Sequence, residues 1–147
     1  MYDFELLTAT SLQEAVTALQ DEETQALAGG QTLIPTMKQR LASPERLVSL
    51  TKIKALQGVT ATAQEVVIGA AARHADVAVE AAAFFPALAD LAGHIGDPAV
   101  RNRGTIGGSL ANNDPAACYP AAVPACGAVI ETNLRRIAAE DYFDGMF

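Results

Sequence analysis

The chain has no tryptophan, few other aromatic residues and only two cysteines, Cys118 and Cys126. A disulfide scaffold or an iron–sulfur site needs more cysteines than these. We therefore predict that both thiols are reduced and partly buried, as free cysteines commonly are. No apolar run reaches the roughly 18 residues that span a bilayer, and the acidic N-terminus lacks the basic start of a signal peptide. These absences predict a cytoplasmic protein without membrane insertion.

Positive charge is also scarce, because the formal net charge is −7 and the isoelectric point is about 4.7. An acidic surface argues against nucleic-acid binding and against an anionic membrane surface. Half of the residues are hydrophobic, and many of these are alanine, so we expect a sizeable, closely packed core. A length of 147 residues fits one domain or two small lobes.

Two glycine-rich segments stand out against this background. The first glycine segment is Ala28–Leu33 (AGGQTL), and the second glycine segment, about 75 residues later, is Thr105–Ser109 (TIGGS). Paired glycines let a backbone approach a ligand and direct successive N–H groups at one anion. Neither segment has a P-loop lysine or a G-x-G-x-x-G pattern, which argues against P-loop and Rossmann binding. One such turn is weak evidence, but two in one domain could clamp the diphosphate of a dinucleotide.

The first part of the chain alternates strand and helix patterns. Ser11 and Glu14 form a capping-box pattern that predicts a helix start. The first glycine pair falls between a predicted strand and a predicted helix, where free N–H groups and the helix dipole favour an anion. We predict a small α/β lobe over residues 1–55 with parallel pairing. Its strands are expected at residues 4–7, 24–28 and 46–50, and its second helix at residues 32–41.

The pattern changes after residue 55, and residues 56–147 are predicted to form a second, α+β lobe. Hairpins are expected around residues 57–69 and 128–137. Helices are expected from His74, over Phe84–Gly93 and over Pro120–Ala125. The second glycine segment is predicted to lie in a long polar loop over residues 101–115, and long loops of this kind are often functional.

The AGGQTL segment and the RNRGTIGGSLANNDPA run, with their separation, resemble the flavin-binding subunit of molybdenum hydroxylases. This family includes the medium subunit of aerobic carbon monoxide dehydrogenase and the flavin domain of xanthine dehydrogenase. The resemblance extends from Phe4 to the Asp141–Phe143 segment. It implies an α+β, two-lobed, PCMH-type FAD-binding domain with FAD as cofactor. Family members continue into a further sheet and a C-terminal domain, so we expect a C-terminally truncated form, ending at Asp144–Phe147, that binds FAD weakly or is purified without it.

The resemblance also implies which residues hold FAD between the two lobes. Backbone amides of residues 28–32 would hold the diphosphate, with Leu33 beside them, and the second glycine segment would contact the diphosphate and ribityl region. Asp114 is a candidate for a ribose or ribityl hydroxyl, or it caps the turn before Pro115. Cys118 falls where some relatives carry an acidic flavin contact. The full implied set is Ala28, Gly29, Gly30, Gln31, Thr32, Leu33, Ile95, Gly96, Thr105, Gly107, Gly108, Ser109 and Asp114.

Other charged side chains allow two interpretations each. His94 could approach the flavin or simply be hydrogen-bonded near a helix end. Arg101 and Arg103 could offset diphosphate charge, or lie in a solvated loop. His74 and His94 are too far apart in the sequence to indicate a metal pair, and Arg135-Arg136 is most simply an exposed strand pair.

No nucleophile–base pair or carboxylate dyad is evident, which fits a flavin carrier whose cofactor performs the chemistry. The resemblance implies a molybdenum-cofactor large subunit and a [2Fe-2S] small subunit as partners, with NAD, a quinone or oxygen as electron acceptor. One alternative is another two-lobed flavoprotein, such as a vanillyl-alcohol-oxidase-type oxidase or a cell-wall precursor reductase. Those would need a substrate-binding cap domain, for which this chain has no room. The other alternative is a flavin-free nucleotide-binding or scaffold fragment of the same fold.

Overall fold

A computed structural model describes residues 1–143, so the expected chain end at Asp144–Phe147 lies outside the described residues. The chain divides into two compact units, Met1–Gly108 and Ser109–Phe147. The predicted boundary between two FAD-binding lobes, at residues 55 and 56, stays a prediction. Within residues 1–143, no helix is long and apolar enough to cross a membrane.

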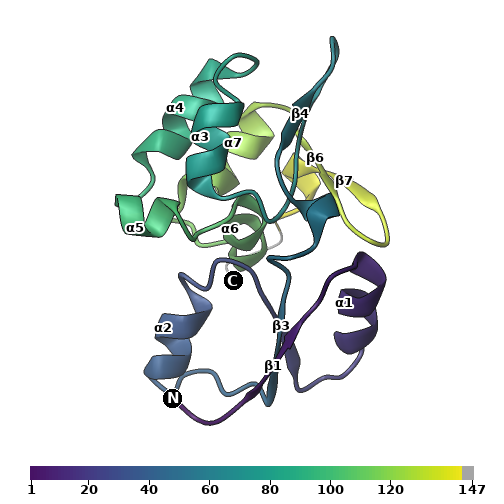
Figure 1. Ribbon diagram of the computed structural model, residues 1–147. Coiled ribbons are helices and arrows are strands. Elements are labelled where there is room, and N and C mark those ends of the chain that lie inside the picture. The colour runs from purple at the N-terminus through teal and green to yellow at the C-terminus, as the bar shows by residue number, and fades with distance from the viewer. Residues whose placement is uncertain (144–147) are drawn as a thin grey trace. The chain divides into compact units, whose positions relative to one another are not determined.

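The first unit begins with a three-stranded parallel sheet (Figure 1). Its strands are β1 (Glu5–Thr8), β2 (Thr24–Leu27) and β3 (Arg46–Ser49), and β3 lies between the other two. Helices α1 (Leu12–Ala18) and α2 (Leu33–Lys38) lie on opposite sides of the strands. The central strand is therefore covered on both faces, and its apolar pair Leu47 and Val48 is fully buried. The predicted parallel α/β arrangement is confirmed.

Helix α1 begins where the capping-box pattern predicts. The Ser11 hydroxyl accepts a hydrogen bond of 3.2 Å from the Glu14 N–H. The Glu14 carboxylate reaches back to the Thr10 N–H at 2.8 Å, one residue before the N-cap. The hydrogen bonds from Thr10 lower the pKa of Glu14. These contacts fix the entry of the chain into α1.

The rest of the first unit contains a hairpin and a set of short helices. The hairpin pairs β4 (Val59–Ala61) with β5 (Val66–Ile68) in antiparallel register, as predicted. The expected helices from His74 and over Phe84–Gly93 are α3 (His74–Glu80) and α4 (Pro86–His94), which pack side by side. A single 3₁₀ turn over Lys54–Leu56 links the sheet to the hairpin.

The predicted loop over residues 101–115 is wrong in its central part. Helix α5 (Pro98–Arg101) runs into its start, and α6 (Ile106–Asn112) fills its middle. Gly107 and Gly108 therefore lie in the first turn of a helix. Two glycines disfavour a helix by roughly 2 kcal/mol. The helix forms because Ile106 and Leu110 are buried one turn apart, and because the Thr105 hydroxyl accepts the Gly108 N–H at 3.1 Å.

The second unit contains α7 (Cys118–Ala125), the antiparallel strands β6 (Val129–Glu131) and β7 (Arg136–Ala138), and a 3₁₀ turn over Ala139–Asp141. The predicted helix and hairpin are confirmed. Helix α7 buries Tyr119 and Val123. Its two ends carry Cys118 and Cys126, which are free but exposed, so the prediction of partly buried thiols is wrong.

Candidate functional site

Within the first unit, the structure packs the first glycine segment against Arg103 and Gly104, directly before the second glycine segment. A Cβ atom added to Gly29 would lie 2.7 Å from both the Arg103 carbonyl carbon and the Gly104 Cα, and closer still to the Arg103 oxygen. A Cβ on Gly108 would lie 3.9 Å from the Ala28 Cβ. Only glycine fits at position 29, because the atoms that it meets are backbone atoms that cannot rotate away.

The first glycine segment presents a row of uncommitted donors. It connects β2 to α2, and Gly30 takes a left-handed conformation with φ of 71°. The backbone bonds of α2 begin only with the Ile34 N–H, which donates to the Gly30 carbonyl at 3.2 Å. Within residues 1–143, the N–H groups of residues 29–33 donate to no other group. Consecutive free N–H groups at a helix start form a favourable environment for an anion.

In the second glycine segment, by contrast, several backbone N–H groups already donate hydrogen bonds within the protein. The Gly107 N–H donates to the Ala70 carbonyl at 2.9 Å, and the Gly108 N–H donates to the Thr105 hydroxyl. A Cβ on Gly107 would lie 2.6 Å from both the Cβ and the oxygen of Ala70. Packing against Ala70 therefore requires glycine at position 107. Among the described residues, the Thr105 N–H remains uncommitted.

Residues 70–74, a turn that leads through an isolated bridge residue into α3, support the second glycine segment, and sequence reasoning missed them. The Ala72 carbonyl accepts the Ile106 N–H at 3.1 Å, and the His74 N–H donates to the Gly104 carbonyl at 3.0 Å. Between these bonds, Arg73 and Thr105 form an antiparallel bridge. No local pattern in residues 70–74 predicts this pairing, because it depends on residues about 30 positions later.

The Ile95–Gly96 turn is held by Arg101. The Arg101 guanidinium donates to the Ile95 carbonyl at 3.1 Å and to the Gly96 carbonyl at 3.0 Å. Gly96 has a φ of 53°, and a Cβ there would lie 3.2 Å from the Val100 side chain. Arg101 is thus neither a solvated side chain nor, in this structure, aimed at an anion. It fixes a turn that the family resemblance places near the cofactor.

The remaining predicted positions have simpler surroundings. The ring of His94 is exposed, with Nδ1 at 2.8 Å from the Asp90 carbonyl oxygen, as its alternative interpretation expects. Asp114 caps its turn, because one carboxylate oxygen accepts the Ala116 N–H at 2.9 Å. Ser109 and Asp114 belong to the second unit, so their contacts with a cofactor stay predictions. Across residues 1–143, no group of three or more acidic, cysteine or histidine residues could hold a metal ion.

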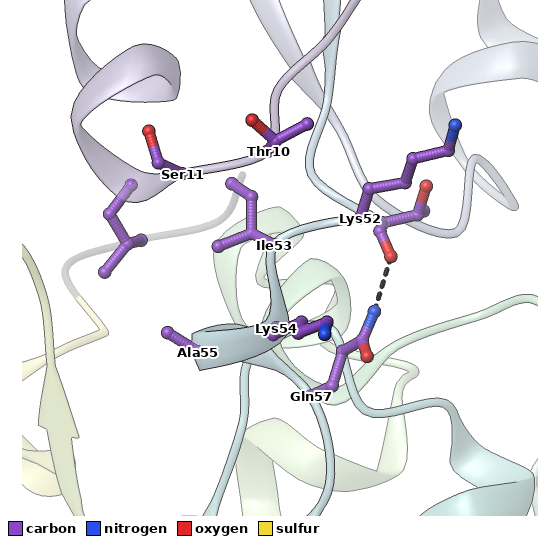
Figure 2. A pocket seen from close by; sticks show the side chains of 9 residues that line it. Thr10, Ser11, Lys52, Ile53, Lys54, Ala55 and Gln57 are labelled. Atoms are coloured by element: carbon purple, nitrogen blue, oxygen red, sulfur yellow. Dashed lines mark hydrogen bonds between the residues drawn. The ribbon is translucent and has the colours of Figure 1, made fainter.

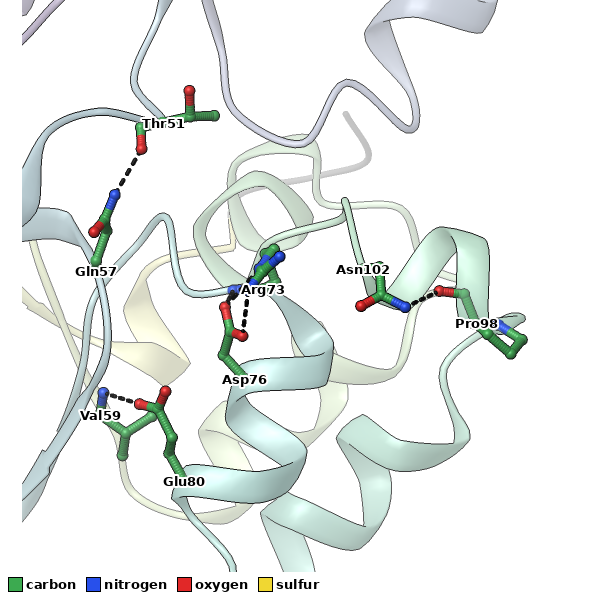
Figure 3. A network of polar contacts seen from close by, with 8 residues as sticks. All are labelled: Thr51, Gln57, Val59, Arg73, Asp76, Glu80, Pro98 and Asn102. Carbon is green, nitrogen blue, oxygen red and sulfur yellow. Dashed lines mark hydrogen bonds and ion pairs between the residues drawn. The ribbon is translucent and has the colours of Figure 1, made fainter.

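Polar contacts fix helix α3 beside the supporting stretch (Figure 3). Arg73 and Asp76 form a bidentate pair with both N–O distances at 2.8 Å, which lowers the pKa of Asp76. At the other end of α3, the Glu80 carboxylate accepts the Val59 N–H at 2.9 Å and ties the helix to β4. At the end of α5, the side-chain amide of the C-cap residue Asn102 donates to the Pro98 carbonyl at 2.7 Å.

A separate hollow on the first unit contains none of the predicted cofactor residues (Figure 2). It lies between the start of α1 and the stretch after β3, and the Gln57 amide closes one side by donating to the Thr51 carbonyl at 2.6 Å. Its walls come from Thr10, Ser11, Leu12, Thr51, Lys52, Ile53, Lys54, Ala55 and Gln57. The candidate site is therefore the contact region of the glycine segments rather than this hollow.

Residues 2–147 match the family described as the FAD binding domain in molybdopterin dehydrogenase. The chain belongs to this family. It is 41% identical to the carbon monoxide dehydrogenase medium chain of Afipia carboxidovorans, over 93% of this chain and 50% of that protein. It is 36% identical to the glyceraldehyde dehydrogenase medium chain of Sulfolobus acidocaldarius, over 99% of this chain and 54% of that protein.

The fold agrees with a solved member of the same group. Carbon monoxide dehydrogenase from Hydrogenophaga pseudoflava, in a form lacking the Mo-pyranopterin moiety, superposes with a TM-score of 0.92 and 38% identity. That match covers 99% of this chain and 53% of the solved chain, so this chain spans about half the length of its relatives. The predicted family, the α+β fold class and FAD as the family's cofactor are confirmed. The names of the relatives as dehydrogenase chains support the predicted oxidoreductase subunit.

The observed geometry fits the diphosphate of FAD. The N–H groups of residues 29–33 are uncommitted and can therefore donate to phosphate oxygens, whereas the missing Cβ atoms at positions 29 and 30 allow close packing against Arg103, Gly104 and Ile34. Acidic side chains are missing from the first glycine segment itself, so no carboxylate in it opposes an anion. The groups that fit the diphosphate are backbone N–H donors. For this reason, the charged side chains of the sequence did not reveal the site.

Proposed function

We propose that this chain is the FAD-holding part of a molybdenum hydroxylase, of the carbon monoxide dehydrogenase or xanthine dehydrogenase type. The observation that carries the proposal is the row of uncommitted N–H groups at residues 29–33, set against the backbone of Arg103 and Gly104. Membership of the FAD-binding family supplies the identity of the anion.

The residues have distinct roles in this proposal. The N–H groups of Gly29, Gly30, Gln31, Thr32 and Leu33 bind the diphosphate. Thr105 adds a donor from the second glycine segment, and Ser109 contacts the cofactor from the same segment. Gly107 and Gly108, whose own N–H groups are engaged within the protein, contact the cofactor as part of this segment. Ile95 and Gly96 line the cofactor in the turn that Arg101 holds. Asp114 keeps one carboxylate oxygen outside its turn bond for a ribose or ribityl hydroxyl.

When bound, FAD supplies electron transfer between partner iron–sulfur clusters and an acceptor such as NAD or a quinone. We propose a molybdenum-cofactor large subunit and a [2Fe-2S] small subunit as partners, located with this chain in the cytoplasm. The name "medium chain" among the relatives supports such an assembly. The chain's own residues bind and orient the cofactor, and the two exposed cysteines cannot themselves hold a cluster.

The test is a titration of the 147-residue chain with FAD, followed by flavin fluorescence, for the wild type and two matched variants. Gln31→Glu adds a negative charge beside the free N–H groups at the start of α2. Gln13→Glu adds the same charge in the first turn of α1, which has no predicted contact with FAD. A carboxylate at a helix start stabilises the helix slightly, so both variants should fold.

We expect Gln31→Glu to weaken FAD binding about tenfold, because an added charge several Å from a diphosphate costs about 1–2 kcal/mol at high dielectric. Gln13→Glu should bind FAD as the wild type does. Equal affinities for all three proteins would refute the diphosphate assignment. A wild-type chain that binds no FAD, while remaining folded by circular dichroism, would favour the scaffold alternative.

A further inference from the structure

His74 lies directly behind the second glycine segment. It is the first residue of α3, and its side chain is buried with 5% exposure. A Cβ on Gly104 would lie 2.5 Å from the His74 Nε2 and 2.9 Å from its Cδ2. The ring therefore rests against the Gly104 backbone, and nothing larger than glycine fits between them.

The same stretch of backbone touches Gly29 on another side. Gly29 meets the Arg103 carbonyl carbon and the Gly104 Cα, whereas His74 meets Gly104 through its ring and through its N–H bond of 3.0 Å to the Gly104 carbonyl. Gly29, Gly104 and His74 are thus packed against one another in this order. Replacing His74 with a side chain of another size should therefore displace Gly104 and so change the gap beside Gly29.

Backbone hydrogen bonds on either side of Gly104 couple its position rigidly to that of its neighbours. The stretch 70–74 holds the second glycine segment through the bonds from Ile106 to Ala72 and from Gly107 to Ala70. Gly104 cannot shift alone without straining this ladder. Burial also lowers the pKa of His74, so a neutral ring fills this position near neutral pH.

We propose that His74 is a positioning residue for FAD: acting through Gly104, it sets the spacing between the two glycine segments. This inference rests on the proposed function, because the spacing matters only if the segments hold one ligand together. His74 is distinct from the residues that donate to the diphosphate. Its role is to support the backbone from which Thr105 donates.

The test is a double-mutant cycle in the 147-residue chain with His74→Ala, Gly104→Ala and the double variant. Val77→Ala is the control, because Val77 is fully buried in the same helix α3. FAD, ADP and riboflavin are titrated separately, at temperatures where each variant is folded by circular dichroism. ADP carries the diphosphate without the flavin ring, whereas riboflavin carries the ring without the diphosphate.

We expect His74→Ala to weaken FAD and ADP by the same factor, about tenfold, which is the effect of losing one charge-assisted hydrogen bond. Riboflavin binding should not change, and Val77→Ala should leave all three affinities within about twofold although it destabilises the fold. Gly104→Ala should weaken FAD as well. Removing the ring should then relieve the overlap, so the double variant should bind FAD more tightly than Gly104→Ala alone.

The outcomes separate the two proposals. If the wild type binds FAD and folded His74→Ala binds it equally well, the positioning role is wrong while the proposed function stands. Additive effects in the cycle, or equal losses for Val77→Ala, would also overturn the positioning role. If the wild type binds neither FAD nor ADP, the proposed function fails and this inference fails with it. Should His74→Ala not fold, His74→Asn, which keeps a polar side chain of smaller size, replaces it in the cycle.

Discussion

Replacing Gly29 with alanine should destabilise the protein, although Gly→Ala substitutions often stabilise. Gly29 is not among the described glycines with positive φ, so alanine meets no backbone strain at this position. By itself, the change would stabilise the fold by about 0.4–1 kcal/mol through the unfolded state. The new methyl group, however, would overlap the Arg103 carbonyl and lie 2.7 Å from the Gly104 Cα.

The overlap decides the sign of the effect. Overpacking costs about 1–3 kcal/mol, and the upper part of this range applies because backbone atoms cannot rotate aside. The net loss in the free energy of unfolding should be about 2 kcal/mol, which corresponds to a melting temperature about 4–8 °C lower. Thermal unfolding followed by circular dichroism, without added FAD, measures this loss.

Gly93→Ala is the matched control for this measurement. Gly93 lies in α4, and a Cβ there would meet only the Ala78 Cβ, at an ordinary distance of 4.0 Å. Alanine in a helix should stabilise by up to about 1 kcal/mol, so the two variants should shift the melting temperature in opposite directions. A Gly29→Ala variant that melts at or above the wild-type temperature would show that Gly29 does not pack against Arg103 and Gly104.

Two further predictions concern stability. Because burial lowers the pKa of His74 below its ordinary value of 6.5, the unfolded chain binds a proton more readily. The contribution of neutral His74 to the free energy of unfolding should therefore be fully present above pH 7, decrease as the pH falls through 6.5, and level off below the pKa of His74 in the folded protein. Melting temperatures measured between pH 8 and pH 5 test this expectation. The His74→Asn variant should lack this part of the pH dependence. Ser11→Ala should cost about 1 kcal/mol by removing the N-cap of α1, measured by urea unfolding, whereas an unchanged midpoint would mean that the Ser11–Glu14 bond contributes nothing.

Local sequence signals were sufficient for the elements with strong periodicity or caps. The capping-box pattern of Ser11 and Glu14 predicted the start of α1. The strand patterns at residues 24–28 and 46–50 predicted the parallel sheet, whose central strand buries Leu47 and Val48. The cap and the apolar pattern of each strand depend on residues within a few positions of each other, which a single sequence displays, and the short strand–helix–strand spacing then indicates parallel pairing.

The second glycine segment was misjudged because its structure depends on distant partners. A glycine pair within a polar run predicts a loop on propensity alone. In the structure, Ala70 accepts the Gly107 N–H and packs where a side chain at position 107 would lie. His74 and Gly104 were overlooked for the same reason, since nothing near either residue in the sequence indicates the other.

The contact between Gly29 and Gly104 also bears on when the site forms. It joins points about 75 residues apart, and closing such a loop costs about 4 kcal/mol of chain entropy. Two glycines bury too little apolar surface to repay that cost, so the sheet and the α3–α4 pair must bring them together. We therefore expect the site to assemble late in folding, after the transition state. A ligand that bridges both segments should consequently slow unfolding and leave the folding rate nearly unchanged.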